Sequence, residues 1–173
     1  MEKLLRILIS FFIVLAFIAI TLPHLAAADS TPLMACRDTN IRDVNTNIGD
    51  VFVWNDPTYL YITYKISDTR WRMTKTHLHV AMSPGDIPQT NKGNPITGRF
   101  HYKGLFENGG GVEYMYKINL AGFNGSKLYI AAHASVRNGE THENEDAWAA
   151  GEEFPGSKGA TYFTYTLKTI MPQ

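Results

Sequence analysis

The sequence predicts an all-β protein, a single antiparallel β-sandwich that follows a cleaved export signal. From residue 45 onward, apolar and polar side chains alternate with period two, and β-branched and aromatic residues are abundant. This alternation is typical of strands that have one buried face. Gly, Asn and Pro interrupt it at short intervals, as turns between antiparallel strands do. No stretch of the sequence carries the apolar stripe of an amphipathic helix.

Residues 1–28 predict a secretory signal peptide. A charged start with Lys3 and Arg6 precedes an apolar run over residues 7–22, and Pro23 is followed by three alanines at 26–28. These are the parts of a cleavable export signal. We expect cleavage before Asp29 and a protein that is secreted or held at the cell surface. An uncleaved anchor is the alternative, although the run is shorter than the roughly 20 residues that span a bilayer.

The single cysteine, Cys36, excludes an intramolecular disulfide. We expect its thiol to be buried. Two alternatives remain open at this position, because residues 33–36 also fit a bacterial lipid-attachment site and a free thiol can join a second chain. Asp29 and Pro32 separate that site from the apolar run, which argues against lipidation.

Composition indicates one domain and excludes some partners. The leader contributes Glu2, Lys3 and Arg6 to totals of 16 acidic and 16 basic side chains, so 15 acidic and 14 basic side chains remain without it. Near-neutral charge argues against nucleic acid, because phosphate binding needs an excess of Lys and Arg on one face. A chain of this length forms one domain with a substantial core. We expect a mobile segment over residues 29–46, the β domain over 47–168 and a tail over 169–173.

The first predicted hairpin spans residues 49–66. Residues 49–54 form one strand, the Asn-Asp-Pro-Thr cluster at 55–58 forms the turn, and residues 59–66 form the second strand. One face of the second strand carries Leu60, Ile62, Tyr64 and Ile66, which we expect in the core.

Residues 71–75 and 76–82 continue the alternation. The expected core face carries Leu78, Val80 and Met82, and the opposite face carries His77 and His79. Pro and Gly then recur through residues 83–99, so we expect a long surface loop there. Such loops are often binding segments.

Three further strands are predicted over residues 112–120, 128–136 and 161–167, with Asn-Gly turns at 124–125 and 138–139. The acidic stretch 140–153 is expected to be a solvated loop. Strands this short, each with one apolar face, predict two packed antiparallel sheets of the immunoglobulin-like or jelly-roll-like kind. A closed barrel is the alternative.

Three histidines predict a candidate metal site. His77 and His79 share one face of a strand, and His133 points outward from another. If the two strands are neighbours, the three imidazoles cluster, and such a set can hold Zn²⁺ or Cu²⁺. The candidates for a fourth ligand are His101, Glu143, Glu145 and Asp146. Ordinary surface or core histidines are the alternative interpretation.

Four aromatic residues predict a candidate ligand-binding surface, namely Trp54, Tyr59, Tyr61 and Trp71. On outward faces of strands, such rings can stack on a sugar or pack against a protein. Packing between neighbouring strands is the alternative. Asn124 begins an Asn-Gly-Ser sequence that fits an N-glycosylation acceptor in an exposed turn.

The sequence holds no signature of catalysis. It lacks the Gly-x-Ser-x-Gly sequence of hydrolases and a phosphate-binding glycine loop before a helix, and no spacing selects a pair of catalytic carboxylates. We therefore expect no enzymatic activity.

Ordered short motifs cover the carboxy-terminal two thirds of the chain. They are GDV at 49–51, ND at 55–56, YLYITY at 59–64, THLHV at 76–80, IPQT at 87–90, GNP at 93–95, LYIAAHA at 128–134, AWAAG at 147–151, FPG at 154–156 and ATYFTYT at 160–166. On these residues the chain resembles a recurring secreted all-β module of bacterial and archaeal surface proteins. The resemblance implies a secreted β domain and no particular reaction.

Together these features predict a secreted or cell-surface protein that binds a glycan or a protein partner. One alternative is an extracellular protein that binds zinc or copper through its histidines. The other is a subunit that self-assembles through exposed strand edges into a homo-oligomer, surface layer or filament.

Overall fold

The computed structural model describes residues 28–37, 44–107, 110–157 and 159–169. The strands are β1 (Asp29–Arg37), β2 (Val44–Asn55), β3 (Tyr59–Ile66), β4 (Trp71–Ala81), β5 (Tyr102–Leu105), β6 (Glu113–Asn119), β7 (Lys127–Asn138), β8 (Asn144–Ala149), β9 (Glu152–Glu153) and β10 (Thr161–Thr166). Single 3-10 turns lie at η1 (Pro84–Asp86), η2 (Thr97–Arg99) and η3 (Leu120–Gly122). The described residues contain no α-helix, which confirms the all-β prediction.

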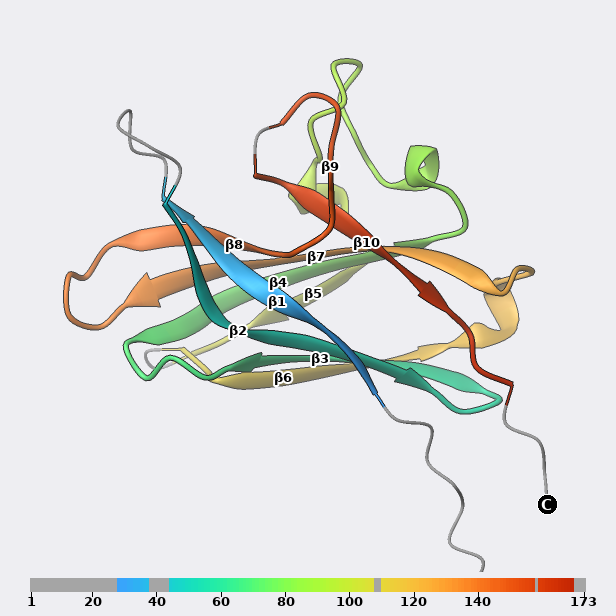
Figure 1. The fold of residues 1–173 in the computed structure, drawn as a ribbon, viewed down its shortest axis with the longest axis horizontal. Helices are drawn as coiled ribbons and strands as arrows, with labels where there is room; N and C mark the ends of the chain where they lie inside the picture. The colour runs from blue at the N-terminus through green and yellow to red at the C-terminus, as the bar shows by residue number, and fades with distance from the viewer. Residues whose placement is uncertain (1–27, 38–43, 108–109, 158, 170–173) are drawn as a thin grey trace, which may run out of the picture.

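The strands form one antiparallel, barrel-like sheet. Eight of them are hydrogen-bonded in the order β5-β4-β7-β8-β1-β2-β3-β6, β10 pairs with β7, and β9 pairs with β10. Figure 1 shows this sheet curled on itself, with β2, β3 and β6 on one side and β4, β5, β7 and β8 on the other. The structure does not show the predicted sandwich of two separate sheets. β1 pairs with both β8 and β2 and so joins the two sides into one sheet.

Aromatic side chains fill the space where the sheet nearly closes, between β6 and the pair β4–β5. Met73 of β4 bridges to Gly111 ahead of β6. The Thr76 and Tyr116 hydroxyl oxygens lie 2.8 Å apart, and the Tyr102 and Tyr116 ring centroids lie 6.0 Å apart. Polar contacts and ring packing therefore complete the closure where the ladder is interrupted.

The barrel interior holds the main core. It includes all four apolar residues predicted from the second strand of the first hairpin, and the predicted inward residues of β7, namely Leu128, Ile130, Ala132, Ala134 and Val136, are fully buried. Met82, predicted to face the core, is instead exposed, because it follows the last residue of β4.

A second apolar cluster lies on the outer face of β4, β7 and β8. It consists of Ala81, Ile87, Phe100, Ala131, Trp148, Phe154, Ala160 and Tyr162. The predicted loop over residues 83–99 covers this face, and it is anchored by buried Ile87 and by Phe100, the residue that follows it. Its outer part is closed by a bridge between Gln89 and Pro95. β7 is consequently buried on both faces.

Several predicted boundaries differ from the structure. Residues 29–46, predicted to be a mobile segment, contain β1 and the start of β2, because β1 fills the position between β8 and β2. The predicted solvated loop over residues 140–153 contains β8 and β9. Residues 1–27 of the predicted leader and residues 170–173 of the tail lie outside the described residues. Cleavage, membrane retention and lipidation at Cys36 stay predictions.

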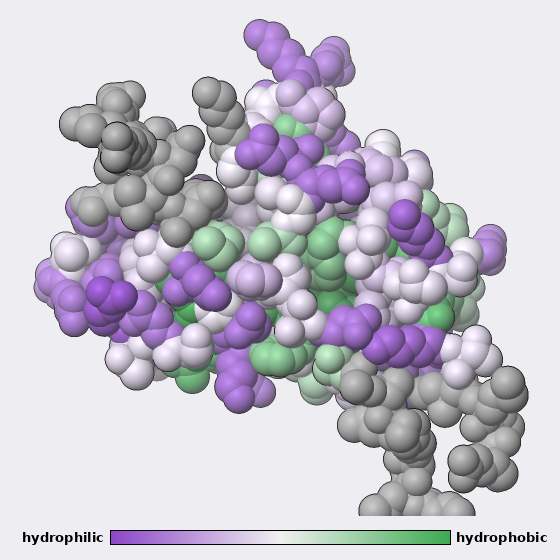
Figure 2. Space-filling model, viewed as in Figure 1, coloured by the Kyte–Doolittle hydropathy of each residue, from purple (hydrophilic) through white to green (hydrophobic). Residues whose placement is uncertain are grey.

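One face of the protein has an apolar centre. Figure 2 shows apolar atoms near the middle of the view, with hydrophilic atoms around them. A small cavity of about 150 Å³ lies between β1, β2 and β10, and its lining includes Val51, Val53 and Phe163.

Within the described ranges, no helix is both long and apolar enough to cross a membrane.

Candidate functional site

Two groups of side chains on the outer surface of the sheet are candidates for function. The first is the histidine group, which we define as His77 on β4, His133 on β7 and Asp146 on β8. The second is the aromatic strip, which we define as Trp54, Tyr59 and Tyr61 on β2 and β3.

His77 and His133 form a direct pair across two neighbouring strands. They lie opposite each other in the β4–β7 register. Their Nδ1 atoms are 3.2 Å apart, and their ring centroids are 5.4 Å apart. His133 is buried, whereas His77 is only partly buried, so water can reach the pair from the side of His77. The prediction that these two imidazoles meet is confirmed by the register.

Asp146 of β8 orients His133. Its Oδ1 lies 2.9 Å from Nε2 of His133, and the hydrogen bond from His133 lowers the pKa of Asp146. With both rings neutral, one proton arrangement satisfies these contacts: Nε2–H of His133 donates to Asp146, and Nδ1–H of His77 donates to Nδ1 of His133. Burial, the neighbouring His133 and the nearby Lys103 and Lys75 lower the pKa of His77, which favours its neutral form.

His79 does not join this pair. Its ring stacks on His101 at a centroid distance of 4.6 Å and lies 5.6 Å from Phe100. Its side chain is buried, and its Nδ1 has no hydrogen-bond partner among the described residues. Within the described part of the chain, no group of three or more His, Cys, Asp or Glu side chains is arranged to hold a metal ion. The predicted set of His77, His79 and His133 therefore does not converge on one point.

Acid should weaken the fold through His79. Burial, followed by repulsion from His101, lowers its pKa from 6.5 to about 4, although Asp86 acts in the opposite direction. As the pH falls below 6.5, the unfolded chain binds a proton that the folded chain does not. The contribution of neutral His79 to stability is therefore fully present above pH 6.5 and is lost as the pH falls towards 4. At pH 5 the free energy of unfolding should be lower by about 2 kcal/mol.

Urea unfolding at pH 7 and at pH 5 measures this effect. The lowered pKa of His77 acts in the same direction. Both pH values lie above the lowered pKa of Asp146, so its carboxylate stays ionised in both measurements. His79→Leu should remove most of the difference between the two pH values. An equal pH dependence in the wild type and in this variant would contradict the prediction.

The aromatic strip lies on the outer face of the opposite side of the barrel. Trp54 and Tyr61 are cross-strand partners, and their rings stack with centroids 3.8 Å apart and an interplanar angle of 7°. Tyr59 meets Tyr61 edge-on at 6.3 Å. The Nζ atom of Lys117, on β6, lies 4.0 Å from the centre of the Tyr59 ring. All three rings of the strip are partly exposed.

Trp71 does not belong to this surface. It is 5% exposed and belongs to the main core. The expectation that Trp71 lies on an outward face, where its ring could meet a ligand, is therefore wrong. The first residue of β4 points into the barrel, and alternation across the preceding turn did not reveal this orientation.

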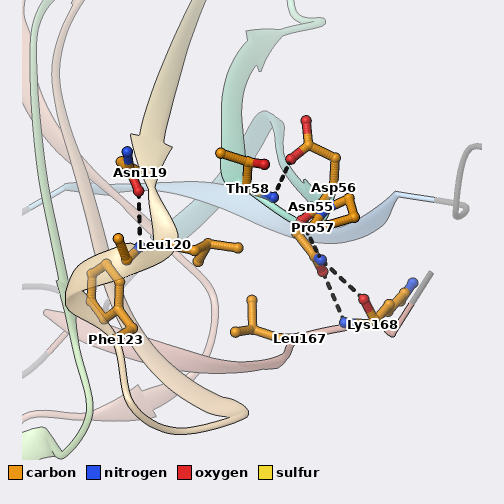
Figure 3. A pocket seen from close by; sticks show the side chains of 10 residues that line it. Asn55, Asp56, Pro57, Thr58, Asn119, Leu120, Phe123, Leu167 and Lys168 are labelled. Carbon is orange, nitrogen blue, oxygen red and sulfur yellow. Dashed lines mark hydrogen bonds between the residues drawn. The ribbon is translucent and has the colours of Figure 1, made fainter. Parts of the chain in front are cut away.

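A cavity of about 400 Å³ lies beside the aromatic strip, at the end of the barrel. Figure 3 shows Asn55, Asp56 and Thr58 on one side of it, and Leu120, Phe123 and Leu167 on the other. Asp56 connects the cavity to the strip, because its Oδ2 accepts a hydrogen bond from the Tyr61 hydroxyl at 2.9 Å. The buried amide of Asn55 fixes the segment that follows β10 through hydrogen bonds with the backbone of Lys168.

Sequence reasoning missed Lys117 and Trp148, whose ring lies 4.7 Å from that of His133. It named Asp146 as a candidate metal ligand and not as the hydrogen-bond partner of His133. Alternation in the predicted strand over residues 112–120 places Lys117 outward, and that signal was available. The charged residues of β8 concealed this strand, and with it the approach of Asp146 and Trp148 to His133. Asn124 is exposed, as predicted, and its glycosylation stays a prediction.

Comparison of the chain with known proteins adds no family. No protein-family model, no curated protein and no solved structure matches it. The function therefore has to be argued from the geometry of the two groups.

Proposed function

We propose that this protein is a non-catalytic binding protein, working outside the cell or at its surface, and that it recognises a glycan through the aromatic strip. The observation that carries the proposal is the convergence of three partly exposed rings and one lysine on a single stretch of sheet. The predicted leader supports the location.

The chemistry of the strip suits a sugar. The C–H face of a pyranose packs on the face of an aromatic ring. Trp54 and Tyr61 each cover one face of the other in their stack, so the opposite face of Trp54 is the one that a sugar can use. Lys117 lies over the face of the Tyr59 ring and can donate to a hydroxyl group of a sugar. Asp56 accepts from the Tyr61 hydroxyl and can accept from a sugar hydroxyl as well. The cavity beside Asp56 extends the surface and offers room for a second sugar unit.

Rigid strands hold the strip in place. Tyr61 is fixed by its stack on Trp54 and by its hydrogen bond to Asp56, which also accepts from the backbone N–H groups of Thr58 and Tyr59. A surface ordered in this way loses little conformational entropy when a ligand binds. Cross-strand packing of these rings also stabilises the sheet, and this role is compatible with binding.

Binding to a broad panel of polysaccharides and oligosaccharides tests the proposal. Trp54→Ala and Tyr61→Ala should each weaken binding about 5- to 30-fold, because each removes stacking area worth about 1–2 kcal/mol. Lys117→Ala should weaken it less.

Tyr129→Ala is the matched control. Tyr129 is another partly buried surface ring with a lysine nearby, since Nζ of Lys127 lies 5.3 Å from its centroid, and it lies on β7, away from the strip. Its substitution should leave binding unchanged. The absence of binding across the whole panel, or equal losses in the control and in the strip variants, would remove the proposal.

Self-assembly stays a prediction. In the barrel-like sheet, Met73 of β4 bridges to Gly111 ahead of β6, and Tyr102 of the end strand β5 packs on Tyr116 of the end strand β6, which reduces the strand edge available for pairing with a second copy.

A further inference from the structure

We infer that His77 and His133 form a two-histidine site for a borderline divalent metal ion, Zn²⁺ or Cu²⁺, with Asp146 holding His133 in its ligating orientation. This site lies on the opposite side of the barrel from the aromatic strip and is independent of the proposed glycan binding.

The spacing of the two imidazoles suits a shared metal ion. Two nitrogens bound to a tetrahedral ion at about 2.0–2.1 Å are separated by about 3.3 Å. The two Nδ1 atoms are 3.2 Å apart. They are already turned towards each other by the cross-strand register, so no strand has to move to bring them together.

Metal binding replaces the hydrogen bond between the rings. The centroid distance of 5.4 Å indicates that the two nitrogens face each other almost directly, as in a shared-proton contact. To ligate a tetrahedral metal ion, each ring turns by about 35° from this in-line arrangement. The proton on Nδ1 of His77 moves to its Nε2 through water. Both imidazoles stay neutral, so no net proton is released when both are neutral beforehand.

Asp146 supplies the support that metal-binding histidines usually have. A carboxylate that accepts from the second ring nitrogen fixes the tautomer and the ring orientation and increases the basicity of the ligand. The 2.9 Å contact between Asp146 and Nε2 of His133 leaves the lone pair of His133 on Nδ1, where it faces His77.

The donor set selects the class of metal. Imidazole nitrogens favour Zn²⁺, Cu²⁺ and Ni²⁺, whereas Ca²⁺ and Mg²⁺ prefer oxygen ligands. The described residues offer no third His, Cys, Asp or Glu ligand at this site. Water or a donor atom of a bound molecule therefore fills the remaining coordination positions. The nearby Lys75 and Lys103 oppose a cation, although Nζ of Lys103 is bonded to the carbonyl of Gly98 at 2.7 Å. These features predict moderate affinity.

Titration of the full-length, tag-free chain with ZnCl₂ and, separately, CuCl₂ tests the site. Calorimetry should show one equivalent of bound ion, and Cu²⁺ should quench the fluorescence of Trp148, which contacts His133. His77→Gln and His133→Gln should each lower the affinity at least tenfold, and Asp146→Asn should lower it about 10- to 100-fold.

His101→Gln is the control, because His101 contacts His79 and is exposed. It should bind metal as the wild type does. If the buried His133→Gln variant does not fold, the partly exposed His77→Gln variant decides. No binding by the wild type, or binding that survives His77→Gln unchanged, overturns the inference.

Discussion

Trp71→Ala should lower the free energy of unfolding by about 3–5 kcal/mol. Trp71 is 5% exposed and packs in the main core at the start of β4. Truncation of a buried indole removes its transfer free energy and leaves a cavity that a barrel of paired strands cannot readily fill. Urea unfolding followed by circular dichroism gives the number.

Trp54→Ala is the matched comparison, because Trp54 is partly exposed on the outer face of β2. It loses the stack on Tyr61 and should cost only about 0.5–1.5 kcal/mol. The two tryptophans thus separate stability from the proposed binding. Equal destabilisation by the two substitutions would contradict the placement of Trp71 in the core.

Gly49→Ala should destabilise the protein by roughly 3 kcal/mol. Gly49 is buried in β2, next to an irregularity in the β1–β2 register where Gly49 pairs with Leu33 and Asn47 pairs with Met34. A methyl group there would overlap the carbonyl oxygen of Lys65 in β3. Since the obstacle is backbone, strands β2 and β3 have to separate to admit it.

Gly98→Ala is the control for this substitution. A Cβ added at Gly98 meets no atom within 4 Å, so the change should stay within about 0.5 kcal/mol. Thermal unfolding of both variants measures the difference. A Gly49→Ala variant as stable as Gly98→Ala would show that β2 and β3 approach less closely than the structure has them.

Strands with one apolar face were predictable from the sequence. The strand expected over residues 59–66 is observed as β3 with the same bounds, and its apolar residues lie in the core. β5 was missed because its four residues place only Gly104 in a buried position. β8 was missed because its first three residues are Asn, Glu and Asp, so only its end is apolar. Local pattern identifies strands that carry their own apolar face, and these two take part through their neighbours.

The candidate site was predictable only in part. Alternation placed His77, His79 and His133 on outward positions. The register confirms that His77 and His133 form a pair. It could not show that the loop over residues 83–99 folds back over this face, so that His79 is buried beside Phe100. Nor could it show that Trp71 points inward while Trp54 points outward.

The sequence by itself determined the all-β class, the turns and which residues of β3 and β7 enter the core, because these depend on period-two alternation within one strand. Only the tertiary structure decided that the strands form one barrel-like sheet, and that Asp146 reaches His133 while Lys117 reaches Tyr59. The physical reason is that strand order and register come from pairing between segments far apart in the chain. A period-two pattern is the same whichever neighbour a strand receives.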